Sequence, residues 1–557
     1  MKSSSSLKWI IKRSKRQNLK MILLVLANAV FSVLSVLFAF AIKEIIDSAT
    51  GTETLAPSMR RLISYAVAIS IIVILQFVFR VVINGLTEHI RAKLEMEYKS
   101  YLFGQILVKK QDKISGYHSG ELMNRLTNDV SVVADGYSGI LPTVVSAFAR
   151  LLCAVVALII LDWIFAVAFT VAGIMVFAVI GVLRTMLKSL HKKAQETDGK
   201  VRSFMQECIE NLLAVKAFSI NGKIERQAQE LQEENFKVKM QRKNYSVTGH
   251  AIYNFIFSAG YLFALIYGGV KILGDLLSYG SLSAILQLVN NVQVPFASLS
   301  NVLPKYYAMV ASAERLMEIE DVESEVDTPY VDAKSTYENM LGIKIDGVEF
   351  SYDREKVLVD ASFYINKGDF VMIEGSSGVG KSTLIKLLLG VYGVDGGNIE
   401  IKTNDGAIAV DKSTRTLFSY VPQGNMIFSG TIKENVTFVN ESATEEQIEN
   451  ALKISCAYEF ISKLPAGLET VVGENGVGLS EGQVQRLAVA RAILCDAPIV
   501  LLDEATSALD ERTEEELLKN LKALENVTLI IITHKKAAAE ICNRRIKINQ
   551  KNIVELT

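Results

Sequence analysis

Six apolar runs recur through the first half of the chain, separated by charged stretches with a helical period. The first run, residues 21–42, contains no charged residue and is long enough to cross a bilayer as a helix. No small-residue cleavage site follows it, so it does not have the pattern of a signal peptide. The pattern predicts an all-α domain of six transmembrane helices at residues 21–42, 62–79, 140–161, 164–183, 251–273 and 282–309.

The connections between these runs alternate in length. Short links join the first run to the second, the third to the fourth and the fifth to the sixth, whereas residues 80–139 and 184–250 contain long charged stretches. Lysines such as Lys109, Lys110 and Lys192 concentrate there, and positive charge marks the cytoplasmic side of a membrane protein. We therefore expect the basic leader 1–20, both chain ends and both long stretches in the cytoplasm. Short turn helices are expected at residues 119–130 and 206–217.

Composition favours a membrane protein and gives no sign of a nucleic-acid partner. Half of the 557 residues are hydrophobic, mean hydropathy is +0.28 and the formal net charge is −1. A chain of this length is expected to contain more than one domain. The five cysteines are scattered without metal-binding spacing, which is typical of reduced structural thiols.

Polar residues form a stripe on the last apolar run. Plotted at 100° per residue they fall within an arc of about 100°, and such residues face a bundle interior or a wet cavity. We interpret the stripe as lining a transport pathway; the alternative is that these side chains only hold helices together. The residues of the stripe are Gln287, Asn290, Asn291, Ser298 and Asn301.

Arg150 lies near the middle of the third apolar run, where a charge is costly. No acidic residue lies at a comparable depth in another run. We hypothesise that Arg150 faces the pathway and contacts an anionic part of a cargo. The alternative is that it bonds backbone carbonyls or extends to the interface.

A linker at residues 318–340 leads to a second half with the pattern of an α/β nucleotide-binding domain. An apolar strand-like run, a glycine-rich loop and a helical pattern follow one another, and the loop matches the P-loop G-x-x-x-x-G-K-[ST]. Its glycines let backbone N–H groups and a helix N-terminus point at the phosphates of ATP. Lys381 is expected to reach the β- and γ-phosphates, and Ser382 to bind Mg²⁺. The expected ATP-binding residues of the loop are Gly375, Ser376, Ser377, Gly378, Val379, Gly380, Lys381, Ser382 and Thr383.

Other polar residues of this half follow strand-like runs in a fixed order. Asp503 is expected to hold Mg²⁺, and Glu504 to polarise the attacking water. His534 is expected to contact the γ-phosphate or to hold that water in line. Gln423 is expected to reach the metal and sense the nucleotide, and Tyr352 to stack on adenine.

The sequence Leu-Ser-Glu-Gly-Gln at residues 479–483 is similar to the L-S-G-G-Q signature of ATP-binding cassette (ABC) transporters. With the motifs above, residues 341–557 resemble the complete cassette domain of that family, an α/β P-loop NTPase. Residues 21–317, including residues 311–315, resemble the six-helix membrane domain of its exporters. The resemblance covers nearly the whole chain.

The resemblance implies a half-transporter that works as a dimer, with each ATP between the P-loop of one cassette and the signature of the other. Ser480, Gly482 and Gln483 would then contact ATP held by a second copy of this chain or by a related half-transporter. The turn helices at 119–130 and 206–217 would correspond to coupling helices. Glu481 departs from the family because it replaces a signature glycine and adds a carboxylate near the γ-phosphate.

We therefore expect an ATPase of the bacterial plasma membrane that uses ATP and Mg²⁺ to export a cargo by alternating access. The cargo classes that fit are amphipathic, peptide-like, lipid or drug-like molecules. Uptake of a metal-chelate-type cargo through the same fold is an alternative, and so is a role as one half of a heterodimeric exporter. The six apolar runs argue against a soluble cassette protein acting on DNA or ribosomes.

Overall fold

A computed structural model describes residues 2–50, 59–352, 355–376, 378–424, 427–473, 478–524, 526–549 and 552–556. The chain divides into two compact units. One, which we call the helical unit, comprises Met1–Gly104 and Ser119–Glu320. The other, which we call the cassette unit, comprises Gln105–His118 and Asp321–Thr557, so most of the predicted linker 318–340 belongs to it.

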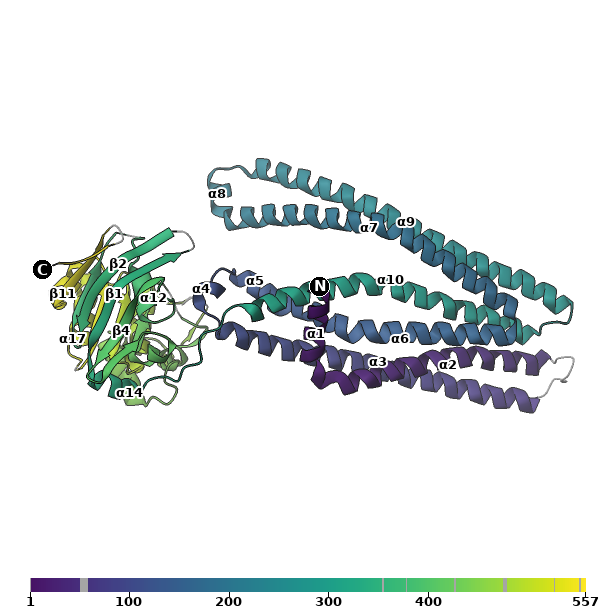
Figure 1. Cartoon of the computed structure of the whole chain (residues 1–557), viewed down its shortest axis with the longest axis horizontal. Helices are drawn as coiled ribbons and strands as arrows, with labels where there is room; N and C mark the ends of the chain where they lie inside the picture. The colour runs from purple at the N-terminus through teal and green to yellow at the C-terminus, as the bar shows by residue number, and fades with distance from the viewer. Residues whose placement is uncertain are drawn as a thin grey trace. The chain divides into compact units, whose positions relative to one another are not determined.

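Long helices make up the helical unit (Figure 1). Helix α2 has 33 residues and α3 has 49, and α7 and α9 lie side by side and are joined through the short helix α8. The elements in chain order are α1 (Lys2–Arg13), η1 (Lys15–Gln17), α2 (Asn18–Thr50), α3 (Met59–Leu107), α5 (Ser119–Asn124), η2 (Arg125–Asp129), α6 (Val130–Leu161), α7 (Trp163–Glu210), α8 (Leu212–Ala217), α9 (Asn221–Leu273) and α10 (Tyr279–Asp321).

Four stretches of the described residues are helical and apolar over a length that crosses a membrane: Lys15–Thr50, Met59–Leu107, Ser119–Leu161 and Asn221–Leu273. Helix α7 has a shorter apolar part, Trp163–Met175. Helix α10 is not among the four because amide side chains interrupt its apolar residues. Six spans therefore stay a prediction, although each predicted run lies in a long helix.

The first turn helix was placed wrongly from the sequence. The chain leaves α3 at Leu107 and contains the short helix α4 (Gln111–Ile114) before α5 begins at Ser119. Residues 119–130 do not reverse the chain, since α5 passes through the π-helical turn η2 directly into α6. The second turn is confirmed, because α8 (Leu212–Ala217) lies between the end of α7 and the start of α9.

Acidic residues fix the helix ends that lie away from these turns. Asp162 caps α7, where its carboxylate accepts from the backbone N–H of Ile164 at 2.9 Å, and it also pairs with Lys271 at the end of α9. Asp47 of α2 accepts from Ser278 at 2.9 Å, just before α10 begins. Because the bonds of Asp162 with Lys271 and of Asp47 with Ser278 join residues more than a hundred positions apart, they fix the order in which the helices pack.

An ion pair with a buried carboxylate joins the start of α6 to α10. Asp129 is 0 % exposed and accepts from Nε of Arg315 at 2.8 Å and from the Ser312 hydroxyl at 2.9 Å. Asp129 is the last residue of the π-helical turn η2, and such turns are rare in helices. The π-helical turn η2 therefore ends at the buried carboxylate that pairs with Arg315.

The cassette unit contains two main sheets. The larger has the strand order β12-β11-β3-β10-β9-β6, in which β11, β3, β10, β9 and β6 run parallel. The smaller is an antiparallel sheet with the order β2-β1-β4-β5. The strands are β1 (Met340–Tyr352), β2 (Glu355–Asn366), β3 (Phe370–Glu374), β4 (Gly396–Thr403), β5 (Gly406–Ala409), β6 (Phe418–Val421), β7 (Gly430–Thr431), β8 (Val471–Val472), β9 (Ile499–Asp503), β10 (Thr528–Ile532), β11 (Arg544–Asn549) and β12 (Asn552–Leu556).

Continuous apolar runs explain the centre of the larger sheet. Every residue of β9 and of β10 is buried, which is the pattern of a parallel strand covered on both faces. Helices cover these faces and contact β3 and β6 as well. The helices of the cassette unit are α4, α11 (Ala333–Glu338), α12 (Lys381–Leu388), η3 (Lys412–Leu417), α13 (Ile432–Thr437), α14 (Glu445–Ile454), α15 (Tyr458–Ser462), η4 (Gly467–Glu469), α16 (Glu481–Leu494), α17 (Glu511–Lys522) and α18 (Lys536–Ile541).

Candidate functional site

The predicted P-loop joins the end of β3 to the start of α12. Gly380 has φ +107°, a left-handed conformation, and a Cβ there would lie 2.6 Å from a Val357 methyl group. Both facts require glycine at this position. Ser377, also predicted in the loop, lies outside the described residues.

Lys381 bends back over the loop that precedes it. Lys381 is only 6 % exposed, and its Nζ donates to the carbonyl oxygens of Gly375 at 2.7 Å and Ser376 at 3.2 Å. Nζ also lies 3.2 Å from Nε2 of His534, which stands two residues after β10 and was predicted to act at the γ-phosphate. The loop thus concentrates a buried positive charge among backbone groups, which suits a phosphate.

Asp503 and Ser382 place oxygen atoms together at the end of β9. The Ser382 hydroxyl donates to Asp503 at 3.0 Å, and the Tyr420 hydroxyl lies 3.5 Å from the other carboxylate oxygen. Asp503 is 1 % exposed, and this burial raises its pKa above the ordinary value, although the Ser382 bond opposes the shift. Burial and the charge of Asp503 raise the pKa of Tyr420 as well. A hydroxyl and a buried carboxylate are ligands that suit a hard cation such as Mg²⁺.

Glu504, the next residue, has a strained backbone. Its φ is +51°, which is rare for a residue with a side chain, and its N–H donates to the Ile532 carbonyl at 3.0 Å. Its carboxylate accepts from the Gln423 amide at 2.6 Å. Gln423 therefore contacts the predicted catalytic acid, while its predicted contact with a metal stays a prediction.

Tyr352 ends β1 and is 39 % exposed. Its ring makes edge contacts with Phe350, at 4.9 Å between centroids, and with Tyr392, at 5.7 Å. The Thr383 hydroxyl donates to Tyr352 at 3.3 Å, so the aromatic residue is tied to the P-loop. This geometry leaves part of the ring available for stacking on a base.

Sequence reasoning did not identify Tyr392. It is 9 % exposed, follows α12 and lies below the cation of Lys386 at 5.7 Å. A hydrogen bond from Ser115, in the segment that follows α3, reaches its hydroxyl. No motif marks Tyr392, because its role depends on a residue almost three hundred positions earlier.

Ser480, Gly482 and Gln483 lie at the start of α16. Ser480 and Gln483 form a capping box, in which the Gln483 side chain accepts from the Ser480 N–H at 2.8 Å. No hydrogen bond found among the described residues joins these three residues to the P-loop. Glu481 is exposed in the first turn of the helix. The signature thus presents a helix N-terminus that its own P-loop does not use.

Gln485, which the sequence did not single out, connects α16 to the turn after Glu504. Its side chain donates to Ser507 at 2.9 Å and accepts from the Ala508 N–H at 3.0 Å. Lys535, next to His534, donates to the carbonyl oxygens of Thr506 at 2.7 Å and Leu509 at 2.8 Å. The signature helix, the catalytic strand end and the His534 loop therefore form one bonded network.

The polar stripe of α10 has mixed surroundings. Asn291 is 9 % exposed and donates to the Ser35 carbonyl of α2 at 3.2 Å, so it holds two helices together as the alternative reading expected. Asn290 is exposed, whereas Gln287 and Ser298 are half-buried. The side chain of Asn301 lies outside the described part of the structure.

Arg150 of α6 shares an aromatic neighbour with a second arginine. Its guanidinium carbon lies 6.0 Å from the ring centroid of Phe31 in α2, and that of Arg80 in α3 lies 5.6 Å from the same centroid. The sequence prediction missed Arg80 because the second apolar run was taken to end at residue 79. Three helices therefore converge at this ring.

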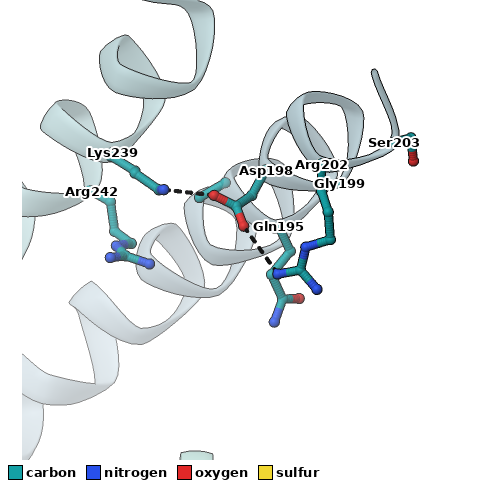
Figure 2. Close-up of a pocket in the computed structure, with 8 residues that line it drawn as sticks. Gln195, Asp198, Gly199, Arg202, Ser203, Lys239 and Arg242 are labelled. Carbon is teal, nitrogen blue, oxygen red and sulfur yellow. Dashed lines mark hydrogen bonds and ion pairs between the residues drawn. The ribbon is translucent and has the colours of Figure 1, made fainter. Parts of the chain in front are cut away.

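A polar hollow of about 380 Å³ lies between α7 and α9 (Figure 2). Asp198 accepts from Lys239 at 2.7 Å and lies 3.7 Å from Arg202, as the dashed lines show. The Lys239 hydrogen bond holds the pKa of Asp198 below its ordinary value. Asp198 of α7 pairs with cations of both helices, Arg202 of α7 and Lys239 of α9, and its pair with Lys239 holds the two helices together at this hollow.

Comparisons with known proteins agree with this geometry. Residues 20–296 match the ABC transporter transmembrane region, and residues 358–507 match the family description ABC transporter. ATP-dependent lipid A-core flippases are among the similar proteins. That of Desulfotalea psychrophila is 29 % identical over 84 % of this chain and 82 % of its own length; that of Salmonella typhimurium is 29 % identical over 85 % and 83 %.

A solved structure supports the same fold. It is described as a bacterial Atm1-family ABC exporter with ATP bound, and its TM-score is 0.81 at 22 % identity, over 97 % of this chain and 95 % of that one. One polypeptide thus carries the transmembrane region and the ATP-binding cassette of a single family. The chain belongs to the ABC transporters, as an exporter-type half-transporter that binds ATP and whose ATPase activity is coupled to transport across a membrane.

Proposed function

We propose that this half-transporter exports a lipid with an anionic headgroup. The observation that carries the proposal is the convergence of Arg80 and Arg150 on the ring of Phe31. A cation at membrane depth is costly and is retained where it has a function. Guanidinium groups bind phosphate through two parallel hydrogen bonds, so a pair of them suits a phosphorylated headgroup.

The lack of an acidic partner strengthens this assignment. None of the ion pairs and side-chain hydrogen bonds found among the described residues involves Arg80 or Arg150. Elsewhere in the helical unit, Arg315 and Lys271 each pair with an aspartate. The two arginines near Phe31 therefore need a counter-charge from outside the chain, and an anionic cargo supplies one. The lipid A-core flippases at 29 % identity are named for a lipid cargo, which agrees with this proposal.

The proposed orientation places both chain ends in the cytoplasm of a bacterium, with the chain spanning the plasma membrane six times. Helices α2, α3, α6, α7, α9 and α10 provide the six spans. The basic leader and the lysine-rich stretches near α4 and α8 then lie on the side where ATP is available. The half-buried and exposed polar residues of α10, Gln287, Asn290 and Ser298, extend the proposed pathway, and Asn301 is its remaining predicted member.

In the cassette unit, we assign the nucleotide site to residues of β3, β9, β10 and their following loops. MgATP supplies the driving force through hydrolysis of its terminal phosphate. Lys381 holds the phosphates, Ser382 and Asp503 hold Mg²⁺, and Tyr352 stacks on adenine. Glu504 accepts the proton of the attacking water, and His534 orients the γ-phosphate.

Two further proposals concern the signature residues and Gln423. Ser480, Gly482 and Gln483 would complete the ATP site of a second copy, because the positive N-terminus of α16 suits a γ-phosphate. Gln423 would leave Glu504 when nucleotide arrives and turn to the metal. Closure of two cassettes would open the pathway outward, and hydrolysis would reset it. A related half-transporter as the partner remains the alternative.

Transport in inside-out vesicles tests the proposed cargo. We expect ATP-dependent flipping of fluorescent phosphatidylglycerol by the wild type, and a loss of at least about tenfold in Arg80→Ala and Arg150→Ala, since truncating one partner of a charge pair weakens binding strongly. The matched control is Arg60→Ala, which removes an exposed arginine at the start of α3. Wild-type flipping by a double variant, Arg80→Ala with Arg150→Ala, would contradict the proposal. ATP-dependent movement of the lipid in the opposite direction would indicate uptake.

A further inference from the structure

A hollow of about 710 Å³ lies between α2 and α3, and neither Arg80 nor Arg150 is among its lining residues. Helix α2 packs closely against α6 and makes only few contacts with α3, which leaves the space between α2 and α3 open. Leu23, Leu26 and Val30 of α2 and Phe79 and Val82 of α3 form its apolar wall. Its volume is in the range of sites that hold small organic ligands, about 300–1,000 Å³.

Polar contacts bound the hollow at both ends. At one end, Nζ of Lys20 lies 2.6 Å from Nε2 of His89. Beyond Val30 at the other end, the Gln76 amide of α3 donates to the Leu34 carbonyl of α2 at 3.2 Å. The space is therefore an apolar groove with a defined length and one basic end.

The basic end has no acidic side chain in its lining. Lys15 and Arg16, just before α2, are exposed, and no acidic residue occurs before Glu44. The acid nearest to His89 in sequence, Glu88, points toward Arg91 at 3.9 Å. The charge at this end thus complements an anion.

The position of Lys20 sets the depth of the groove. Lys20 is the last cation before the uncharged run 21–42, which places its ammonium group at the level of lipid headgroups. From Lys20 to Val30, ten residues of helix cover about 15 Å. That length is roughly half of the ~30 Å hydrocarbon core, or one leaflet.

We propose that this groove binds one anionic phospholipid of the cytoplasmic leaflet as a resident lipid, separate from the cargo. Its phosphate would contact Lys20 and His89, and one acyl chain would lie along the apolar wall toward Val30 and Phe79. The leaflet assignment rests on the orientation given under Proposed function. Binding itself needs neither ATP nor cargo.

Gly85 provides a direct way to fill the groove. It lies in the lining, and a Cβ at this position would meet no atom within 4 Å. A side chain at position 85 would therefore begin in open space, and we expect Gly85→Leu to fill part of the hollow. Gly269 of α9 is equally open and is a matched control.

The test measures lipids retained by the full-length protein in detergent, by native mass spectrometry during titration with phosphatidylglycerol or phosphatidylcholine. We expect the wild type to prefer phosphatidylglycerol. Lys20→Gln with His89→Gln should reduce that preference about fivefold, the effect of a cation near an anionic surface, whereas Lys12→Gln on α1 should not. Gly85→Leu should reduce retention of both lipids, and Gly269→Leu should not.

Two results would overturn the proposal. One is wild-type retention by Gly85→Leu and by the Lys20→Gln, His89→Gln variant. The other is a smaller dimer fraction in Gly85→Leu with lipid retention unchanged, which would mean that a second copy of the chain covers the groove. Because the readout needs no transport, a wrong cargo assignment leaves this test intact.

Discussion

The cassette unit and the helical unit position their charged side chains in different ways. In the cassette, Lys381, Asp503 and His534 follow the neighbouring parallel strands β3, β9 and β10, whose carboxyl ends meet at one edge of the sheet. In the helical unit, Arg80 and Arg150 come from two helices and meet at a ring on a third. The sheet collects polar groups by its topology, whereas the helices must each be packed in the right rotation.

The two units also differ in how their charges are balanced. Buried charges in the helical unit are mostly paired within the chain, as Asp129 is with Arg315, and these pairs hold helices together. In the cassette, the buried carboxylate of Asp503 has a hydroxyl neighbour but no cation within ion-pair distance among the described residues. Charges that the fold leaves unbalanced, Asp503 in one unit and Arg80 with Arg150 in the other, are therefore the best candidates for ligand binding.

The largest effect is expected at the cassette's strained acid. Glu504→Gln should lower ATP hydrolysis by about 10²–10⁴-fold, because it removes a general base and keeps the size of the side chain. ATP binding should persist, as measured by retention of labelled nucleotide, and the purified protein should accumulate as a closed dimer. Glu511→Gln, an exposed glutamate on α17, is the control. Normal turnover in the Glu504 variant would show that the base lies elsewhere.

An intermediate effect is expected at a paired charge of the helical unit. Asp129→Asn should lower the free energy of unfolding by about 1–3 kcal/mol, because the substitution weakens the hydrogen bonds that the buried carboxylate accepts. The loss stays in this range because the Arg315 side chain still reaches solvent. Thermal unfolding in detergent measures the change. The pair of Asp135 and Lys305, in which both side chains are partly exposed, is a matched control, and Asp135→Asn should change stability by about 0–1 kcal/mol. Equal losses of unfolding free energy in Asp129→Asn and Asp135→Asn would contradict the distinction between a buried and a partly exposed carboxylate.

The smallest effect is expected at Asp503, the unbalanced carboxylate of the cassette. Here the substitution should raise stability, whereas Asp129→Asn should lower it. Burial raises the pKa of Asp503, so the folded state disfavours its ionised form relative to the unfolded state. This penalty is present at pH 7 and disappears as the pH falls through the raised pKa. Asp503→Asn should therefore raise the melting temperature of the nucleotide-free protein, by roughly 2–4 °C at most.

The comparison of melting temperatures across pH checks this sign. The difference between Asp503→Asn and the wild type should shrink toward acidic pH, because the wild-type carboxyl is then protonated. Added Mg²⁺ with ATP should reverse the order at pH 7, since the cation compensates only the wild-type charge. A lower melting temperature for the variant without nucleotide would mean that the Ser382 bond outweighs the burial penalty.

Particular residues show how far the sequence could be interpreted. Ser382 and Asp503 were both assigned to Mg²⁺, and the structure places their side chains in hydrogen-bond contact because each lies at the carboxyl end of a parallel strand or directly after the loop that follows one. Their role as metal ligands stays a prediction. The turn helix at 119–130 was misplaced because Gly120 suggested a helix start, and no sequence motif marks the π-helical turn that joins α5 to α6. Asn291 was assigned to a pathway, but its amide donates to a carbonyl of α2. Sequence periodicity shows which residues share one face of a helix, but it does not show what packs against that face.

By itself, the sequence determined the order of membrane helices and cassette, the α/β class of the second half, and the P-loop with its acidic partner strand. These follow from apolar run length, period and motif spacing, all of which act over a few residues. Only the tertiary structure decided that Arg80 joins Arg150, that Tyr392 contacts Tyr352, and that Gln423 contacts Glu504. Each of these contacts joins residues dozens of positions apart, and their geometry depends on how helices rotate and strands align when the core packs.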